Sequence, residues 1–106
     1  AHGGGFAPYQ KGRLMAALDK RPFGKDLLNR SFADQWAQLS FDTAVHRSDA
    51  LQFLVDTAGI DRVLLGSNFG GWDAEDEYRQ MVEGLQLPPG GAEAILGGNA
   101  QRIFKI

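Results

Sequence analysis

The chain has 106 residues, a formal net charge of −2 and no cysteine. The absence of cysteine excludes a disulfide framework and a thiolate metal site, the scattered basic residues disfavour a nucleic-acid-binding surface, and the lack of a long apolar run disfavours a bilayer-spanning helix. We therefore expect a soluble, cytoplasmic protein with no nucleic-acid or membrane partner, in which residues 1–106 form all or part of one domain.

The chain begins with a loop in which His2 precedes three glycines, Gly3–Gly5. A glycine triplet is costly to order, so it predicts a place where the backbone must approach something closely. An imidazole there could bind a metal, polarise a carbonyl or transfer a proton, and the alternative is a histidine that only hydrogen-bonds backbone. A phosphate-binding loop is disfavoured, because the Lys-Ser/Thr pair of a P-loop is missing.

A short helix is predicted around Leu14–Leu18, followed by a less regular stretch from Lys20 to Arg30. Arg13, at the start of this helix, has the planar guanidinium that suits two-point binding of a carboxylate. A surface arginine without such a role is the alternative.

A βαβ unit is predicted next. The alternation over Leu39–Val45 is typical of a strand, and Arg62–Gly66 is a short apolar run that suits a buried parallel strand. Between them Ser48 is the expected N-cap of a helix that ends at Gly59. The buried face of that helix is predicted to carry apolar residues at i, i+3, i+4 and i+7 spacing, namely Leu51, Leu54, Val55 and Ala58.

Polar residues follow both predicted strands. Asp42 is expected to orient a neighbouring loop, and His46 to be a local hydrogen-bonding residue rather than a ligand. Asn68, after the second strand, either projects into a site or forms a structural Asx turn. Both tryptophans are expected to pack, with Trp72 rather than Trp36 lining a pocket.

Helices dominate the remaining sequence. Asp73 is predicted to cap a helix with acidic residues in its first turn and apolar residues through Leu85. The chain then breaks at Pro88–Gly91, before a short helix over Ala92–Leu96 and a last helix capped by Asn99.

Two parallel strands alone leave edges and faces uncovered, so we expect a larger sheet to complete them. The alternating order fits an α/β fold, a (β/α)₈ barrel, in which active-site residues lie at the carboxyl ends of the strands. His2, Asp42 and the turn Gly66–Asn68 all occupy such positions, which predicts that they converge at one rim.

Five motifs in order together indicate a family. The chain resembles the C-terminal third of the amidohydrolase-related enzymes that include aminocarboxymuconate-semialdehyde decarboxylase, γ-resorcylate-type decarboxylases and oxalomesaconate hydratase. The matching motifs are His2–Gly5, Pro8-Tyr9 with Gly12-Arg13, Phe41–Thr43 with His46, Asp61–Asn68, and Gly98–Ala100.

The resemblance implies that residues 1–106 are the C-terminal segment of a metal-dependent (β/α)₈ barrel domain. Its metal, commonly zinc, would be held mainly by ligands outside this chain. His2 would correspond to the active-site histidine that activates water or protonates substrate, and Arg13 to an arginine that grips the substrate carboxylate in a neighbouring subunit. Asn68 stands where the family usually has a metal-site aspartate, and Asp73 is a candidate to supply the missing charge.

The leading hypothesis is therefore a segment of a metal-dependent decarboxylase or hydrolase that acts on a small carboxylated substrate as a homo-oligomer, a dimer for example. The expected site comprises His2 as catalytic residue, Arg13 and Trp72 as substrate-binding residues, and Asn68 and Asp73 at the metal. The alternative is a catalytically silent binding or structural fragment of the same fold, inactive by itself.

Overall fold

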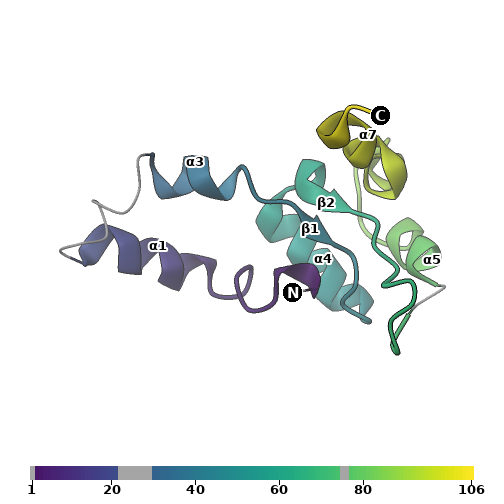
Figure 1. Cartoon of the computed structure of the whole chain (residues 1–106), viewed down its shortest axis with the longest axis horizontal. Helices are drawn as coiled ribbons and strands as arrows, with labels where there is room; N and C mark the ends of the chain where they lie inside the picture. The colour runs from purple at the N-terminus through teal and green to yellow at the C-terminus, as the bar shows by residue number, and fades with distance from the viewer. Residues whose placement is uncertain (1, 22–29, 75–76) are drawn as a thin grey trace.

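Two short parallel strands lie at the centre of the fold, with helices arranged around them (Figure 1). The computed structural model describes residues 2–21, 30–74 and 77–106. Strand β1 (Phe41–Asp42) pairs with β2 (Val63–Leu64), with Phe41 opposite Val63 and Asp42 opposite Leu64. The predicted parallel βαβ unit is confirmed.

Both strands are shorter than the predicted spans 39–45 and 62–66. Among the described residues each strand pairs only with the other, and the paired register covers two residues of each strand. The chain also enters β2 through η2 (Ile60–Arg62), a 3₁₀ turn that includes the residue predicted to begin the strand.

Helix α4 (Ser48–Ala58) connects the strands and packs against β2. The predicted apolar face is confirmed, because Leu51, Leu54 and Val55 are buried. The predicted N-cap is wrong by one residue: Arg47 occupies the cap position, and no side chain there accepts a helix N–H. Gly59 ends the helix as predicted, at φ +92°, with its N–H bonded to the carbonyl of Val55.

The N-terminal segment contains η1 (His2–Gly4), α1 (Lys11–Lys20) and α3 (Phe32–Trp36). The predicted helix around Leu14–Leu18 is confirmed within the longer α1. The predicted irregular stretch from Lys20 to Arg30 falls mostly outside the described residues, and α3 was not predicted.

Trp36 is the packing residue predicted, and it joins three elements. Its ring stacks on Phe32, with centroids 5.9 Å apart, and lies 5.5 Å from the ring of Phe41 at the start of β1. The ammonium of Lys11 lies 4.9 Å from the centre of the Trp36 ring, which brings α1 beside α3. These two helices extend together from one end of the sheet (Figure 1).

Helix α5 (Tyr78–Glu83) begins later than predicted, with Glu77 at its cap position. Asp73 therefore does not cap it, and its carboxylate is bound by Asn68 and His46 instead. The predicted acidic first turn falls partly on residues 75–76, outside the described residues. Leu85 lies beyond the end of this helix.

The last three elements form one continuous helical segment. They are α6 (Gly91–Glu93), η3 (Ala94–Gly98), which is a π-helical turn, and α7 (Asn99–Phe104). The prediction that Asn99 caps a separate helix is wrong. Asn99 has helical dihedral angles, is 2% exposed, and its Nδ2 donates to the carbonyls of Ile60 and Val63, each at 2.8 Å.

Apolar side chains of both strands and of α3, α4, α5 and η3 meet in one core. Over the described ranges, no helix is long and apolar enough to cross a bilayer. The buried members of the core are Trp36, Phe41, Leu51, Leu54, Val55, Val63, Val82 and Ile95.

Candidate functional site

The carboxyl end of β1 holds the N-terminal loop through one carboxylate. Asp42 Oδ1 accepts hydrogen bonds from the backbone N–H of Gly3 at 3.0 Å and of Ala44 at 2.9 Å. Asp42 Oδ2 lies 3.2 Å from Nδ1 of His2. The prediction that Asp42 orients a neighbouring loop is confirmed, and that loop carries His2.

The glycines explain how the loop approaches β1. All three have positive φ, and a Cβ at Gly3 would lie 2.3 Å from Val45 Cγ1, while one at Gly4 would lie 2.5 Å from the ring of Phe41. Such distances are far below van der Waals contact, so only glycine fits. The close approach predicted for the triplet is confirmed for these two glycines, and the partners at these positions are side chains of this chain.

The carboxyl end of β2 is tied to β1 by a buried threonine. Thr43 is fully buried, and its Oγ1 lies 3.1 Å from both the N and the O of Gly66, accepting from the first and donating to the second. A Cβ at Gly66 would lie 2.9 Å from Cβ of Asp42, so the turn passes directly against the residue that holds His2.

The turn after β2 brings Asn68 and Asp73 together. Asn68 Nδ2 donates to Asp73 Oδ1. Asn68 itself has a positive φ of 52°, and its backbone carbonyl accepts from Gly71 N–H at 2.8 Å. The turn is thus closed by backbone rather than by an Asx bond, and the amide side chain is directed at the carboxylate.

A second histidine contacts the same carboxylate. His46 Nε2 lies 3.3 Å from Asp73 Oδ2 and 3.4 Å from the hydroxyl of Tyr78. His46 is therefore a hydrogen-bonding residue as predicted, although its partners are distant in sequence. The apolar spacing of the helix that follows does not indicate this contact of Tyr78, whose hydroxyl is the feature that could have indicated a polar partner.

These contacts favour a charged Asp73. Partial desolvation opposes ionisation, but hydrogen bonds from its own backbone N–H, from Asn68 and from His46 outweigh it and lower the pKa of the Asp73 carboxyl. The turn therefore holds an anionic carboxylate beside a neutral amide, and both present oxygen atoms of the kind that divalent cations prefer.

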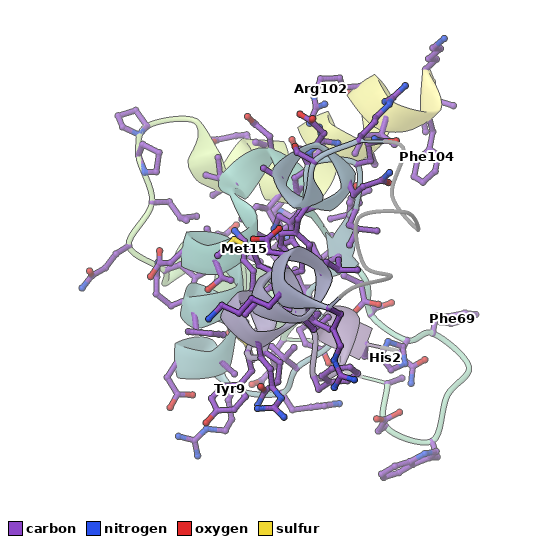
Figure 2. The ribbon with its side chains drawn as sticks, turned by 90° about the vertical axis from the view of Figure 1, so that its left-hand side faces the viewer. His2, Tyr9, Met15, Phe69, Arg102 and Phe104 are labelled. Atoms are coloured by element: carbon purple, nitrogen blue, oxygen red, sulfur yellow. The ribbon has the colours of Figure 1, made fainter. Side chains whose placement is uncertain are left out.

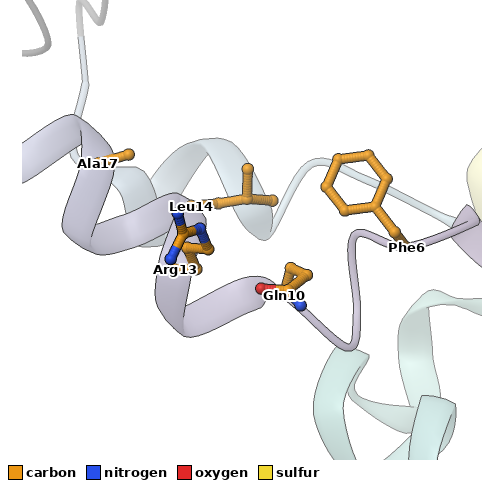
Figure 3. A pocket seen from close by; sticks show the side chains of 5 residues that line it. All are labelled: Phe6, Gln10, Arg13, Leu14 and Ala17. Atoms are coloured by element: carbon orange, nitrogen blue, oxygen red, sulfur yellow. The ribbon is translucent and has the colours of Figure 1, made fainter.

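The predicted substrate-binding residues lie further out. Arg13 lines a concavity of about 440 Å³ against α1 together with Phe6, Gln10, Leu14 and Ala17 (Figure 3). Trp72 is 97% exposed in the loop after β2, so the prediction that it packs is wrong for the part of the chain that the structure describes. Phe69 is equally exposed, and its ring extends into solvent (Figure 2). Neither Arg13 nor Trp72 contacts the His2–Asp42 pair, and their roles stay predictions.

The histidines and acidic residues of residues 2–21, 30–74 and 77–106 do not gather into a group of three that could hold a metal ion. His2 and Asn68 bind different partners, one at the end of β1 and the other in the turn after β2. The His2–Asp42 pair is nevertheless next to the turn that carries Asn68, since Asp42 and Gly66 lie against each other. Both belong to the carboxyl end of the sheet, where parallel α/β folds place their active sites.

Comparison with known proteins places this site in context. The family model described as amidohydrolase matches residues 1–106. A 2-amino-3-carboxymuconate-6-semialdehyde decarboxylase from Dictyostelium discoideum is 31% identical over all of this chain and 30% of its own length. A 2-keto-4-carboxy-3-hexenedioate hydratase from Sphingobium sp. (strain NBRC 103272 / SYK-6) is 27% identical over 97% of this chain and 31% of its own length.

Solved structures agree in fold. Apo IDCase of Metarhizium anisopliae has a TM-score of 0.74 at 25% identity, over 99% of this chain and 32% of that protein. A dihydroxybenzoic acid decarboxylase from Polaromonas sp. JS666, with bound manganese and the inhibitor 2-nitroresorcinol, has a TM-score of 0.73 at 22% identity, over 98% and 32%. The chain thus spans about a third of the length of the relatives that it matches. The predicted α/β fold, the C-terminal part of a (β/α)₈ barrel, is confirmed.

Proposed function

The chain belongs to the amidohydrolase family, and on that basis we propose that it is a segment of a metal-dependent carboxy-lyase or hydrolase that acts on a small carboxylated substrate. The observation that carries the proposal is the pairing of His2 with Asp42 at the carboxyl end of β1. A decarboxylase and a hydratase among the relatives support this class of reaction.

His2 is the acid/base residue of this proposal. Its side chain is half exposed, with a relative accessibility of 50%, while its ring is bound to a carboxylate at one nitrogen. Such an imidazole can both receive and deliver a proton near neutral pH. In a decarboxylation the proton would be delivered to the carbon that loses carbon dioxide.

Asn68 and Asp73 are the proposed metal-side residues. Their oxygen atoms suit a divalent cation, and zinc and manganese are the candidates, with further ligands supplied from outside this chain. When bound, such a cation supplies Lewis-acid polarisation of substrate and a lowered pKa for coordinated water. Asp73 contributes the negative charge, and Asn68 holds that carboxylate by its hydrogen bond.

Arg13 is the residue proposed to bind the substrate carboxylate, and it would do so across the contact between two copies of the protein. Trp72 is proposed to line the substrate-binding pocket. Arg13 is exposed beside a mostly apolar concavity, which suits a guanidinium that binds a carboxylate at an interface. Trp72 offers a large exposed ring on the loop that also carries Asp73.

The proposal is tested on the intact protein, depleted of metal and reloaded with Zn²⁺ or Mn²⁺, by measuring carbon dioxide release from dihydroxybenzoates and carboxylated dienes. We expect His2→Gln to lower kcat by about 10²–10⁴-fold. Arg13→Gln should raise KM, whereas Arg79→Gln, an exposed arginine paired with Glu83, should change neither constant. A loaded protein that turns over none of these compounds, nor hydrates or hydrolyses them, would contradict the proposal.

A second candidate rests on Asn68. A neutral amide at a position where related enzymes usually have a carboxylate favours a binding fragment that has lost its chemistry. Metal content separates the two: a stoichiometric, tightly held cation supports the enzyme, and its absence with retained binding of small acids supports the binding protein. Asn68→Asp adds a discriminating arm, since it should increase turnover only if the site is catalytic.

A further inference from the structure

The carboxylate of Asp42 is fixed on two sides by backbone. Its Oδ1 accepts from Gly3 N–H, in the loop, and from Ala44 N–H, just after β1. The loop is itself pressed onto the strand, because Gly3 leaves no room for a Cβ against Val45. The second oxygen, Oδ2, is consequently presented to the ring of His2 from a rigid support.

The chemistry of this contact determines the tautomer of the imidazole. An ionised carboxylate has only acceptor atoms, so the hydrogen in the 3.2 Å contact must come from Nδ1 of His2. A neutral ring with its hydrogen on Nδ1 has its lone pair on Nε2. Nε2 is then the atom that accepts a proton from the substrate or delivers one to it.

We propose that Asp42 is a positioning residue for His2, which holds the ring as the Nδ1–H tautomer and directs Nε2 toward the substrate. The inference rests on the proposed function in assigning proton transfer to His2, and adds which atom transfers the proton and which residue selects it. Asp42 acts through His2 and does not itself exchange a proton with substrate.

The first test needs no variant. We would record ring ¹⁵N shifts of the intact, isotope-labelled protein at alkaline pH and assign the His2 signals with His2→Gln. The expected result is a protonated Nδ1 and an unprotonated Nε2. A His2 ring protonated at Nε2 in the unmodified protein would overturn the inference.

The second test removes the charge. In Asp42→Asn the carboxamide can turn its NH₂ toward Nδ1, so the ring should shift to the Nε2–H tautomer. We expect kcat to fall by about 10²–10⁴-fold with KM changed less than about threefold, because binding is not disturbed. Asp42→Glu should recover part of kcat, as it restores an acceptor.

Asp56→Asn is the matched control, since Asp56 is an exposed carboxylate on α4 that accepts from Gln52. It should leave the His2 shifts and kcat unchanged. Retention of both the Nδ1–H tautomer and kcat in Asp42→Asn would refute the positioning role. A protein without turnover would refute the proposed function alone, and the tautomer measurement would still decide this inference.

Discussion

The hydroxyl of Thr43 lies 3.1 Å from both the backbone nitrogen and the backbone oxygen of Gly66. One side chain thus continues the pairing of β1 and β2 beyond the last residues of their ladder. This link connects the loop that carries His2 with the turn that carries Asn68, because Thr43 follows Asp42 directly.

Thr43→Val should therefore destabilise the protein while preserving the shape of the side chain. The hydroxyl is fully buried, and its removal leaves the N–H and the C=O of Gly66 without this partner. We expect a loss of about 1–3 kcal/mol in the free energy of unfolding, measured by urea denaturation. Thr57→Val, a half-buried position on α4, is the control and should cost less than about 0.5 kcal/mol. Equal losses in the two variants would show that the link contributes nothing.

Gly3→Ala should release the N-terminal loop from β1. The new Cβ would overlap Val45, and the backbone has φ +58°, which alanine adopts at a cost. The expected destabilisation is about 2–4 kcal/mol. Gly12→Ala, on α1 with open space around it, should instead stabilise by about 0.5–1 kcal/mol. Thermal denaturation measures both variants, and an unchanged stability of Gly3→Ala would show that the close packing of Gly3 on Val45 does not hold the loop on β1.

Asn99→Ala should be among the most damaging substitutions in the C-terminal half. It removes a buried donor that serves two carbonyls, those of Ile60 and Val63, and of the two the Ile60 carbonyl keeps its bond from the N–H of Val63. We expect a cost of about 2–4 kcal/mol by urea denaturation. Gln101→Ala, an exposed side chain two residues along α7, should lie within about 0.5 kcal/mol of the parent protein.

The turn after β2 should loosen in acid. The pKa of Asp73 is lowered in the folded protein, so this carboxylate stabilises the fold above its ordinary value of 3.8 and the contribution is lost as pH falls through the lowered value. The ¹³C shift of its carboxyl group and the side-chain amide signals of Asn68 should therefore change together below about pH 3.8. In Asp73→Asn the Asn68 signals should not move over that range. A carboxyl that titrates at or above 3.8 would contradict the assignment.

The local sequence pattern was enough to predict elements whose conformation depends mainly on their own residues. The apolar spacing of α4 and the glycine at its end both describe a helix that buries one face, and the structure agrees. Helix α3 could also have been predicted, because a serine followed three residues later by an acidic residue is typical of a helix start. Ser31 Oγ accepts from the backbone N–H of Asp34 and donates to its carboxylate.

Contacts between distant residues could not be predicted in this way. The pattern around Asn99 is that of a cap, and only the close approach of β2 shows that its amide is used inside the fold. The same holds for Asp73, whose carboxylate is engaged by Asn68 and His46 instead of a helix. The glycine residues at positions 3 and 4 indicated a close approach of the backbone to another group. They did not indicate that the neighbouring side chains would be Val45 and Phe41.

The π-helical turn Ala94–Gly98 makes the final helical segment tolerant of the loss of one residue at this place. A π turn contains one residue more than the corresponding α-helical turn, so deleting a residue here would restore regular winding without breaking the helix. The residues after such a deletion would keep their orientation, because an α turn covers about the same rotation with one residue fewer. Asn99 would still face the two carbonyls that it serves, whereas a deletion within the regular turns of α7 would rotate the residues after it by about 100°.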